Sequence, residues 1–150
     1  MPFPLDRFIQ AQSTSYLTAL AEVRVGYKCS HWMWYIFPQL KGLGLSSMAT
    51  YYGIDGEEEA RAYLNHPILG ARLREITLAL LNVEDKTAQE IFGWTDTMKL
   101  RSCMTLFNAV ASGDDLFQKV LEKYYNGKPD DRTLELLKAA PNGAYPFNLN

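Results

Sequence analysis

The chain has 150 residues, 47% of them hydrophobic and 21% charged, which is typical of one soluble globular domain with a packed core and excludes a disordered chain. The formal net charge of -2 gives no surplus of positive charge, which argues against general electrostatic binding of nucleic acid. The start lacks a signal peptide, and no apolar stretch approaches the roughly 20 residues of a membrane-spanning helix. We therefore expect a cytoplasmic protein that binds neither nucleic acid nor membrane.

A first helix is predicted over residues 6–25 by residues that recur three or four positions apart. They share one helical face and are apolar with one exception: Phe8, Gln12, Tyr16, Leu20 and Val23. The exception is Gln12. Gly26 follows, where a glycine commonly ends a helix.

The most distinctive stretch is residues 29–44, which combines two tryptophans, a tyrosine and a phenylalanine with one of the two histidines. Its aromatic part is apolar on every side, so we interpret it as a buried helix that Ser30 caps and Pro38 ends. The alternative is a central β-strand, because aromatic residues favour strands. The helix is favoured because no second segment with strand periodicity is present to pair with it.

Capping residues predict two short helices after this stretch. A serine of residues 46–47 opens the first, which Gly53 closes. Asp55 and Glu58 have the spacing of a capping box for the second. The acidic run 57–59 at its start is interpreted as a solvated cluster at the positive end of the helix dipole.

The middle of the chain contains three further helical patterns. Pro67 suits the first turn of a helix, and Thr87 caps a short one that Gly93 ends. Thr95 or Asp96 then caps a longer helix. The helix after Pro67 has a predicted buried stripe of Leu69, Leu73, Ile76 and Leu80. The helix after Gly93 has one of Leu100, Cys103, Met104, Phe107 and Val110.

The last two predicted helices begin at Asp114 and after Pro129, with a break at residues 126–127 between them. From about residue 140 the composition indicates an irregular tail. No repeat or linker divides the chain. The sequence thus predicts an all-α fold, a compact single domain over residues 1–150 with about eight helices, several of them short.

Cysteine and histidine spacing gives no metal site. Without an export signal, Cys29 and Cys103 are expected to be reduced thiols, with a disulfide between them as the alternative. Cys29 and His31 are two residues apart, but His66 and Cys103 stand alone, and the paired spacings of metal-binding motifs are absent. We predict neither a metal nor a cofactor.

His31 is the first candidate functional residue. A histidine can act as a general base near neutral pH, or it can be a structural residue that hydrogen-bonds the backbone. In the predicted helix it shares a side with Trp34 and Tyr35, and Lys28 lies about one turn earlier. An imidazole and an amine beside flat rings suit a planar or anionic ligand.

The loop of residues 42–47 is the second candidate. Gly42 and Gly44 would let the backbone approach a ligand closely, and amides at the helix that Ser46 opens would face an anion. The loop is neither a P-loop nor a dinucleotide-binding fingerprint. An ordinary turn between helices is the alternative.

The third candidate is the helix after Gly93. Asp96 and Lys99 are three residues apart and can pair, while Lys99 and Ser102 border its apolar face. The alternatives are that Asp96 caps the helix and that Lys99 extends to solvent along it. The catalytic candidates are His31, Asp96 and Lys99. The predicted ligand-binding residues are Lys28, His31, Trp32, Trp34, Gln39, Gly42, Gly44, Ser46, Lys99 and Ser102.

Several motifs together identify a resemblance. HWMWYIFPQ at residues 31–39, GLG at 42–44, YLNHP at 63–67 and KLRSCMTLF at 99–107 resemble a bacterial family known only as a domain of unknown function. The resemblance implies a compact, mainly helical cytoplasmic protein and supplies no catalytic residues. Some members carry an automated calpastatin label, but such an inhibitor is a disordered chain, whereas this composition predicts a packed core.

Two hypotheses of different classes follow. The first is a pocket for a small anionic or nucleotide-like metabolite, with a hydrolase of an ADP-ribose-like compound as one version by analogy. The second is a non-catalytic protein-interaction or structural module, in which the aromatic residues are core and the polar residues are caps. An interaction module would expose an apolar patch. Neither hypothesis specifies an oligomeric state.

Overall fold

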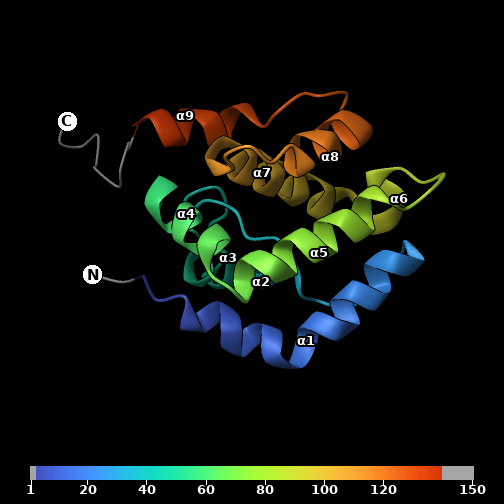
Figure 1. The fold of residues 1–150 in the computed structure, drawn as a ribbon, viewed down its shortest axis with the longest axis horizontal. Helices are drawn as coiled ribbons and strands as arrows, with labels where there is room; N and C mark the ends of the chain where they lie inside the picture. The colour runs from blue at the N-terminus through green and yellow to red at the C-terminus, as the bar shows by residue number, and fades with distance from the viewer. Residues whose placement is uncertain (1–2, 140–150) are drawn as a thin grey trace.

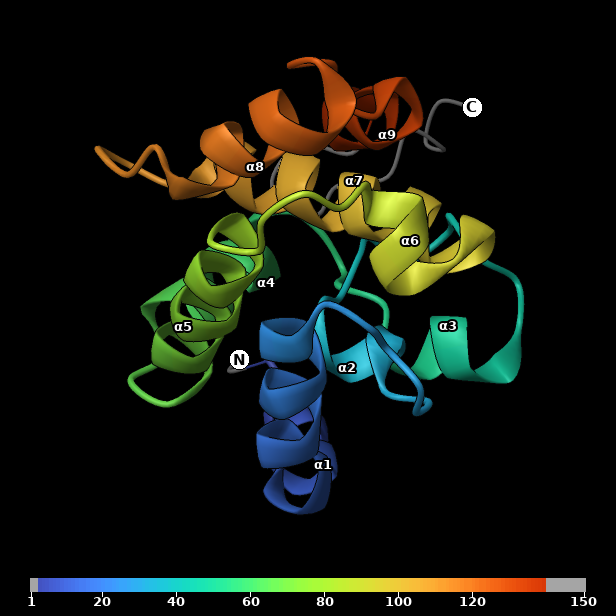
Figure 2. The same cartoon turned by 90° about the vertical axis from the view of Figure 1, so that its right-hand side faces the viewer.

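The computed structural model describes residues 3–139, in which the backbone forms nine α-helices and no strand. The long helices α1 (Asp6–Val25), α5 (Leu69–Leu81) and α7 (Trp94–Val110) organise the fold, with α5 between α1 and the layer of α7, α8 (Leu116–Tyr125) and α9 (Asp131–Ala139) (Figures 1 and 2). The all-α prediction is confirmed. The tail predicted from about residue 140 lies outside the described residues.

Four shorter helices complete the described part of the chain. They are α2 (Met33–Ile36), α3 (Ser47–Tyr51), α4 (Glu57–Asn65) and α6 (Ala88–Phe92). α7 packs against α4, α6, α8 and α9, whereas α1 packs against α2 and α5. No helix in residues 3–139 is long and apolar enough to cross a membrane.

α1 forms as its periodicity predicts, since all five residues of the predicted stripe are buried. Gly26 has φ +86°, and its N–H donates to the carbonyls of Glu22 and Val23, which ends the helix. The polar exception also has a role: Nε2 of Gln12 donates to the Tyr35 carbonyl at 2.8 Å and to the Tyr63 hydroxyl at 3.0 Å. Gln12 therefore joins α1 to the aromatic segment and to α4.

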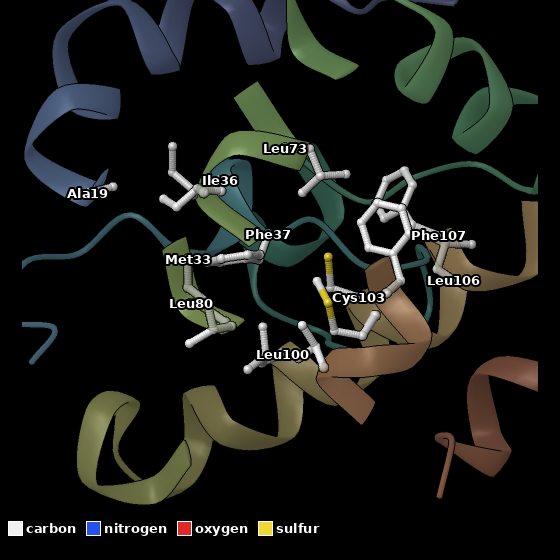
Figure 3. Packing of buried hydrophobic residues seen from close by; sticks show 14 of the residues in the cluster. Ala19, Met33, Ile36, Phe37, Leu73, Leu80, Leu100, Cys103, Leu106 and Phe107 are labelled. Carbon is white, nitrogen blue, oxygen red and sulfur yellow. The ribbon is translucent and has the colours of Figure 1, made fainter. Parts of the chain in front are cut away.

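The aromatic segment is buried, but the predicted helix from Ser30 is wrong. α2 has four residues and begins at Met33, and its N-cap Trp32 makes no side-chain cap. Trp32, Met33, Ile36 and Phe37 are only 1–2% exposed. Figure 3 shows Met33, Ile36 and Phe37 among core residues of α5 and α7. The apolar composition of the segment therefore predicted its burial correctly, but not the residue at which the helix begins.

Several other helix starts also differ from the predictions. Gly56 rather than Asp55 precedes α4, and the Asp55 N–H donates to Glu59 instead of pairing with Glu58. Pro67 lies just before α5 rather than in its first turn. α7 begins directly after Gly93, so neither Thr95 nor Asp96 caps it.

Other local predictions are confirmed. Thr87 and Glu90 form a capping box for α6, and Gly93 ends that helix. The predicted stripes of α5 and α7 are buried throughout. Cys29 and Cys103 are both free thiols, so no disulfide joins them, and burial raises the pKa of Cys103.

Glu59 does not belong to a solvated cluster, because it is 1% exposed and pairs with Arg7 at 2.9 Å. The same guanidinium donates to the carbonyls of Pro4 at 2.6 Å, Tyr51 at 2.9 Å and Gly53 at 3.0 Å. Arg7 therefore joins the start of α1 to the turn after α3 and to α4. A buried charge in this position depends on its partner.

Substitution Arg7→Met should lower the free energy of unfolding by about 3–5 kcal/mol, because it leaves the Glu59 carboxylate buried without a counter-charge. Urea denaturation followed by circular dichroism would measure the loss. The matched control is Arg61→Met, which removes the half-exposed pair of Arg61 and Glu57 within α4 and should cost about 0.5 kcal/mol or less. Equal losses in the two variants would contradict the assigned role of Arg7.

Candidate functional site

A groove of about 280 Å³ lies between α7, the loop after α2 and the start of α9. Its lining residues are Gln39, Leu43, Gly44, Thr95, Met98, Lys99, Ser102, Asp130 and Arg132. The structure thus brings four predicted ligand-binding residues together: Gln39, Gly44, Lys99 and Ser102. Trp34, Gln39 and Lys99 also line a smaller neighbouring hollow.

Lys99 is the central cation of the groove. Its Nζ lies 4.9 Å from the ring centroid of Trp34, a cation–π distance, and 3.7 Å from Oδ1 of Asp96. Neither contact is a hydrogen bond, and the ammonium has no hydrogen-bond acceptor within residues 3–139. The side chain is 23% exposed. An ammonium has three N–H donors, so Lys99 keeps donor capacity for a bound anion.

Asp96 lies between two lysines. Its Oδ2 is 2.9 Å from Nζ of Lys28, which also donates to the Ser30 carbonyl at 2.6 Å and lies 4.9 Å from the ring centroid of Trp32. Because the shorter contact goes to Lys28, most of the charge of Asp96 is compensated there. The group formed by Lys28, Asp96 and Lys99 has a net positive charge, and its excess lies on the side of Lys99.

Glu22 organises the segment that carries Lys28 and Trp32. Its Oε1 accepts hydrogen bonds from the Trp32 indole at 2.8 Å and from the backbone N–H groups of Cys29 and Ser30, and Oε2 accepts from the Ser30 hydroxyl at 2.5 Å. Desolvation acts to raise the pKa of this carboxyl, but the four hydrogen bonds outweigh it and lower the pKa to about 2. Sequence reasoning missed Glu22.

His31 does not join this group. It precedes α2, its side chain is exposed, and it lines neither hollow that contains Lys99. The predicted helical side shared by His31 and Trp34 is therefore wrong, because His31 lies before the helix. Trp32 is buried, its ring lies beside Nζ of Lys28, and its indole N–H donates to Glu22.

The glycine loop contributes one residue to the groove. Gly44 lines it, and a Cβ there would lie 2.8 Å from Cβ of Ala49, so close packing against α3 requires glycine. Gly42 has φ +103°, a turn conformation that favours glycine, and does not line the groove. Ser46 caps α3, because its hydroxyl accepts from the Ala49 N–H at 3.1 Å.

Sequence reasoning also missed the contribution of α9. Asp130 and Arg132 lie on the groove because α9 packs back against α7. Oδ2 of Asp130 accepts from the backbone N–H of Thr133 at 2.9 Å and from its hydroxyl at 2.6 Å, so this carboxylate serves as a cap. Arg132 is exposed, 3.8 Å from Glu135. No local pattern in the sequence predicts that α9 packs against α7.

Residues 2–137 match a family model whose description is "Protein of unknown function (DUF1810)". The chain belongs to this family. It is also similar to the conserved hypothetical protein Rv1873 from Mycobacterium tuberculosis, whose crystal structure superposes with a TM-score of 0.90 at 47% sequence identity and covers 92% of this chain and 99% of that one. No curated protein matches the chain. The resemblance inferred from the motifs is confirmed.

The lowered pKa of Glu22 predicts how its contribution to stability changes with pH. Because the pKa is lower in the folded state than its ordinary value of 4.5, the ionised carboxylate stabilises the fold above pH 4.5. That contribution should disappear as the pH falls to about 2. The difference in unfolding free energy between wild type and Glu22→Gln, measured in urea, should therefore shrink over this interval.

The control for this series is Glu84→Gln, which removes an exposed carboxylate from the loop after α5. Its difference from wild type should be small at neutral pH, since an exposed group makes little net contribution. If Glu22→Gln and Glu84→Gln behaved alike at every pH, the hydrogen bonds to Glu22 would not stabilise the segment.

Proposed function

We propose that this protein binds a small anionic metabolite in the groove beside Lys99. The observation that supports the proposal is that the Lys99 ammonium lines the groove, is partly exposed to solvent and has no hydrogen-bond acceptor within the described residues. A hydrogen bond from an ammonium to an anion is charge-assisted and therefore stronger than a neutral one. A bound phosphate or carboxylate would supply the missing acceptor.

The other lining groups also favour an anion. The side-chain amide of Gln39 and the hydroxyl of Thr95 make no hydrogen bond within residues 3–139 and can donate to a ligand. Arg132 adds a second positive charge at the rim. Asp96 pairs mainly with Lys28, and Asp130 is the one carboxylate among the lining residues, so the two cations Lys99 and Arg132 outnumber it.

The size of the groove limits the ligand. Its volume of about 280 Å³ lies just below the range of about 300–1,000 Å³ that is usual for small-molecule sites. One phosphate or carboxylate with a small organic body fits this volume, whereas a whole dinucleotide would extend into solvent. Such a ligand suits the cytoplasmic location predicted from the sequence.

Binding is favoured over hydrolysis. A general base must reach the reacting group, yet His31 lies outside the groove, and Asp96 and Asp130 are held by other partners. Of the three catalytic candidates, Lys99 is the one that lines the groove, and its donors make no hydrogen bond within the described residues. We assign it the role of binding the anion.

Substitution Lys99→Met should weaken the binding of inorganic phosphate at least tenfold, because a hydrogen bond to a charged group contributes about 1.5–3 kcal/mol. Titration calorimetry of wild type and variant would measure this change. Lys119→Met, which removes a half-exposed lysine from α8, and His31→Ala should bind phosphate as wild type does. Absence of phosphate binding by the wild type, or unchanged binding by Lys99→Met, would contradict the proposal.

Substitutions of Lys28 and Asp96 should act in opposite directions. Lys28→Met leaves Asp96 to pair with Lys99, so phosphate should bind about two- to fivefold more weakly, as the loss of an ion pair of about 0.5–1 kcal/mol implies. Asp96→Asn removes the competing carboxylate, so phosphate should bind more tightly by a similar factor. The same calorimetric titration applies. Changes of the same sign in both variants would contradict the charge arrangement described above.

A further inference from the structure

An apolar strip adjoins the cationic groove. Met98 lines the groove and is 45% exposed, and Trp94 lies one turn earlier in α7 and is 67% exposed. Side chains four residues apart are neighbours on a helix surface, so these two form a continuous apolar edge. Lys99 and Met98 both line the groove, which places the ammonium near this edge.

Packing of the protein itself does not account for this strip. The buried face of α7 is made by other residues, from Leu100 onward, and neither Trp94 nor Met98 belongs to the core cluster. Single exposed apolar residues are common on protein surfaces. Here, however, an indole and a thioether lie next to a cation with unused hydrogen-bond capacity, which is the combination that an amphipathic anion would complement.

We infer that the ligand of this groove is an anion attached to an apolar or aromatic body, with its anionic group at Lys99 and its body across Met98 toward Trp94. This inference rests on the proposed function and specifies its ligand class. The charge of the ligand is complementary to Lys99 and Arg132. The apolar part of the ligand would cover the side chains of Met98 and Trp94, which are otherwise exposed to water. Removing this apolar surface from water would add to the affinity.

The groove favours a small molecule as the occupant. The apolar edge is short, since it consists of Met98 and Trp94 at the first two turns of α7. A phenyl ring with an attached phosphate spans a cation and one neighbouring helical turn of about 5.4 Å. Phenyl phosphate is therefore a suitable probe, and methyl phosphate provides the same anionic group without the ring.

Titration calorimetry of both esters tests the inference. The wild type should bind phenyl phosphate about tenfold more tightly than methyl phosphate, in line with burial of part of the ring. Trp94→Ser and Met98→Gln should each reduce this preference, because each should weaken the binding of phenyl phosphate more than that of methyl phosphate. Both side chains are substantially exposed, so the variants should fold. Leu17→Ser, which changes an exposed leucine of α1, is the matched control and should retain the preference.

The outcomes separate this inference from the proposed function. Equal binding of the two esters by wild type, with a loss of both in Lys99→Met, would overturn the apolar body and leave the anion site. A preference for phenyl phosphate that survives in both Trp94→Ser and Met98→Gln would also overturn the inference, because the ring would then lie elsewhere. If neither ester binds to the wild type, the proposed function fails as well.

Discussion

The carboxylate of Asp96 is the charge on which the arrangement of the candidate site depends. It joins Lys28, from the segment after α1, to α7 at 2.9 Å, and it approaches Lys99 only to 3.7 Å. One negative charge thus serves two ammonium groups, and each ammonium also lies over an indole ring. Because an indole face attracts a cation without accepting a conventional hydrogen bond, it can hold Lys99 in place while leaving its donors free. Fixed position with unused donor capacity is what distinguishes Lys99 from an ordinary surface lysine.

Much of the fold could be predicted because it depends on local patterns. The stripe of α1, the glycine after it and the capping box at Thr87 involve residues within a few positions of one another. The predictions failed where a distant partner competes for a capping group. Ser30 has the side chain of a helix cap, but its hydroxyl donates to Glu22, and Asp96 pairs with Lys28 instead of capping α7. For Ser30 a charge-assisted hydrogen bond replaces a neutral cap, and for Asp96 an ion pair with Lys28 replaces hydrogen bonds to backbone N–H groups.

The candidate site was predictable in part for the same reason. Lys99 and Ser102 were found because they border an apolar stripe, whereas His31 was misplaced once the helix was predicted to begin too early. Asp130 could not be found, since only tertiary packing brings α9 to the groove. The role of Glu22 could have been suspected from its position, because an acidic residue in the last turn of a helix is unfavourable next to the negative end of the helix dipole. That local conflict indicates a partner elsewhere in the fold, which proves to be the segment around Trp32.

The two functional hypotheses differ in what they require of the polar residues, and the hydrogen bonds show which of these residues serve the fold. A purely structural module requires that these residues serve the fold. Ser46 and Asp130 do so, because each satisfies backbone N–H groups at a helix start. Lys99 and Gln39 stabilise no helix end, and within the described residues their donors are unused. The aromatic residues divide in the same way, with Trp32 in the core and Trp34 under the free ammonium. One aromatic segment can therefore belong to the core on one side and line a hollow beside Lys99 on the other.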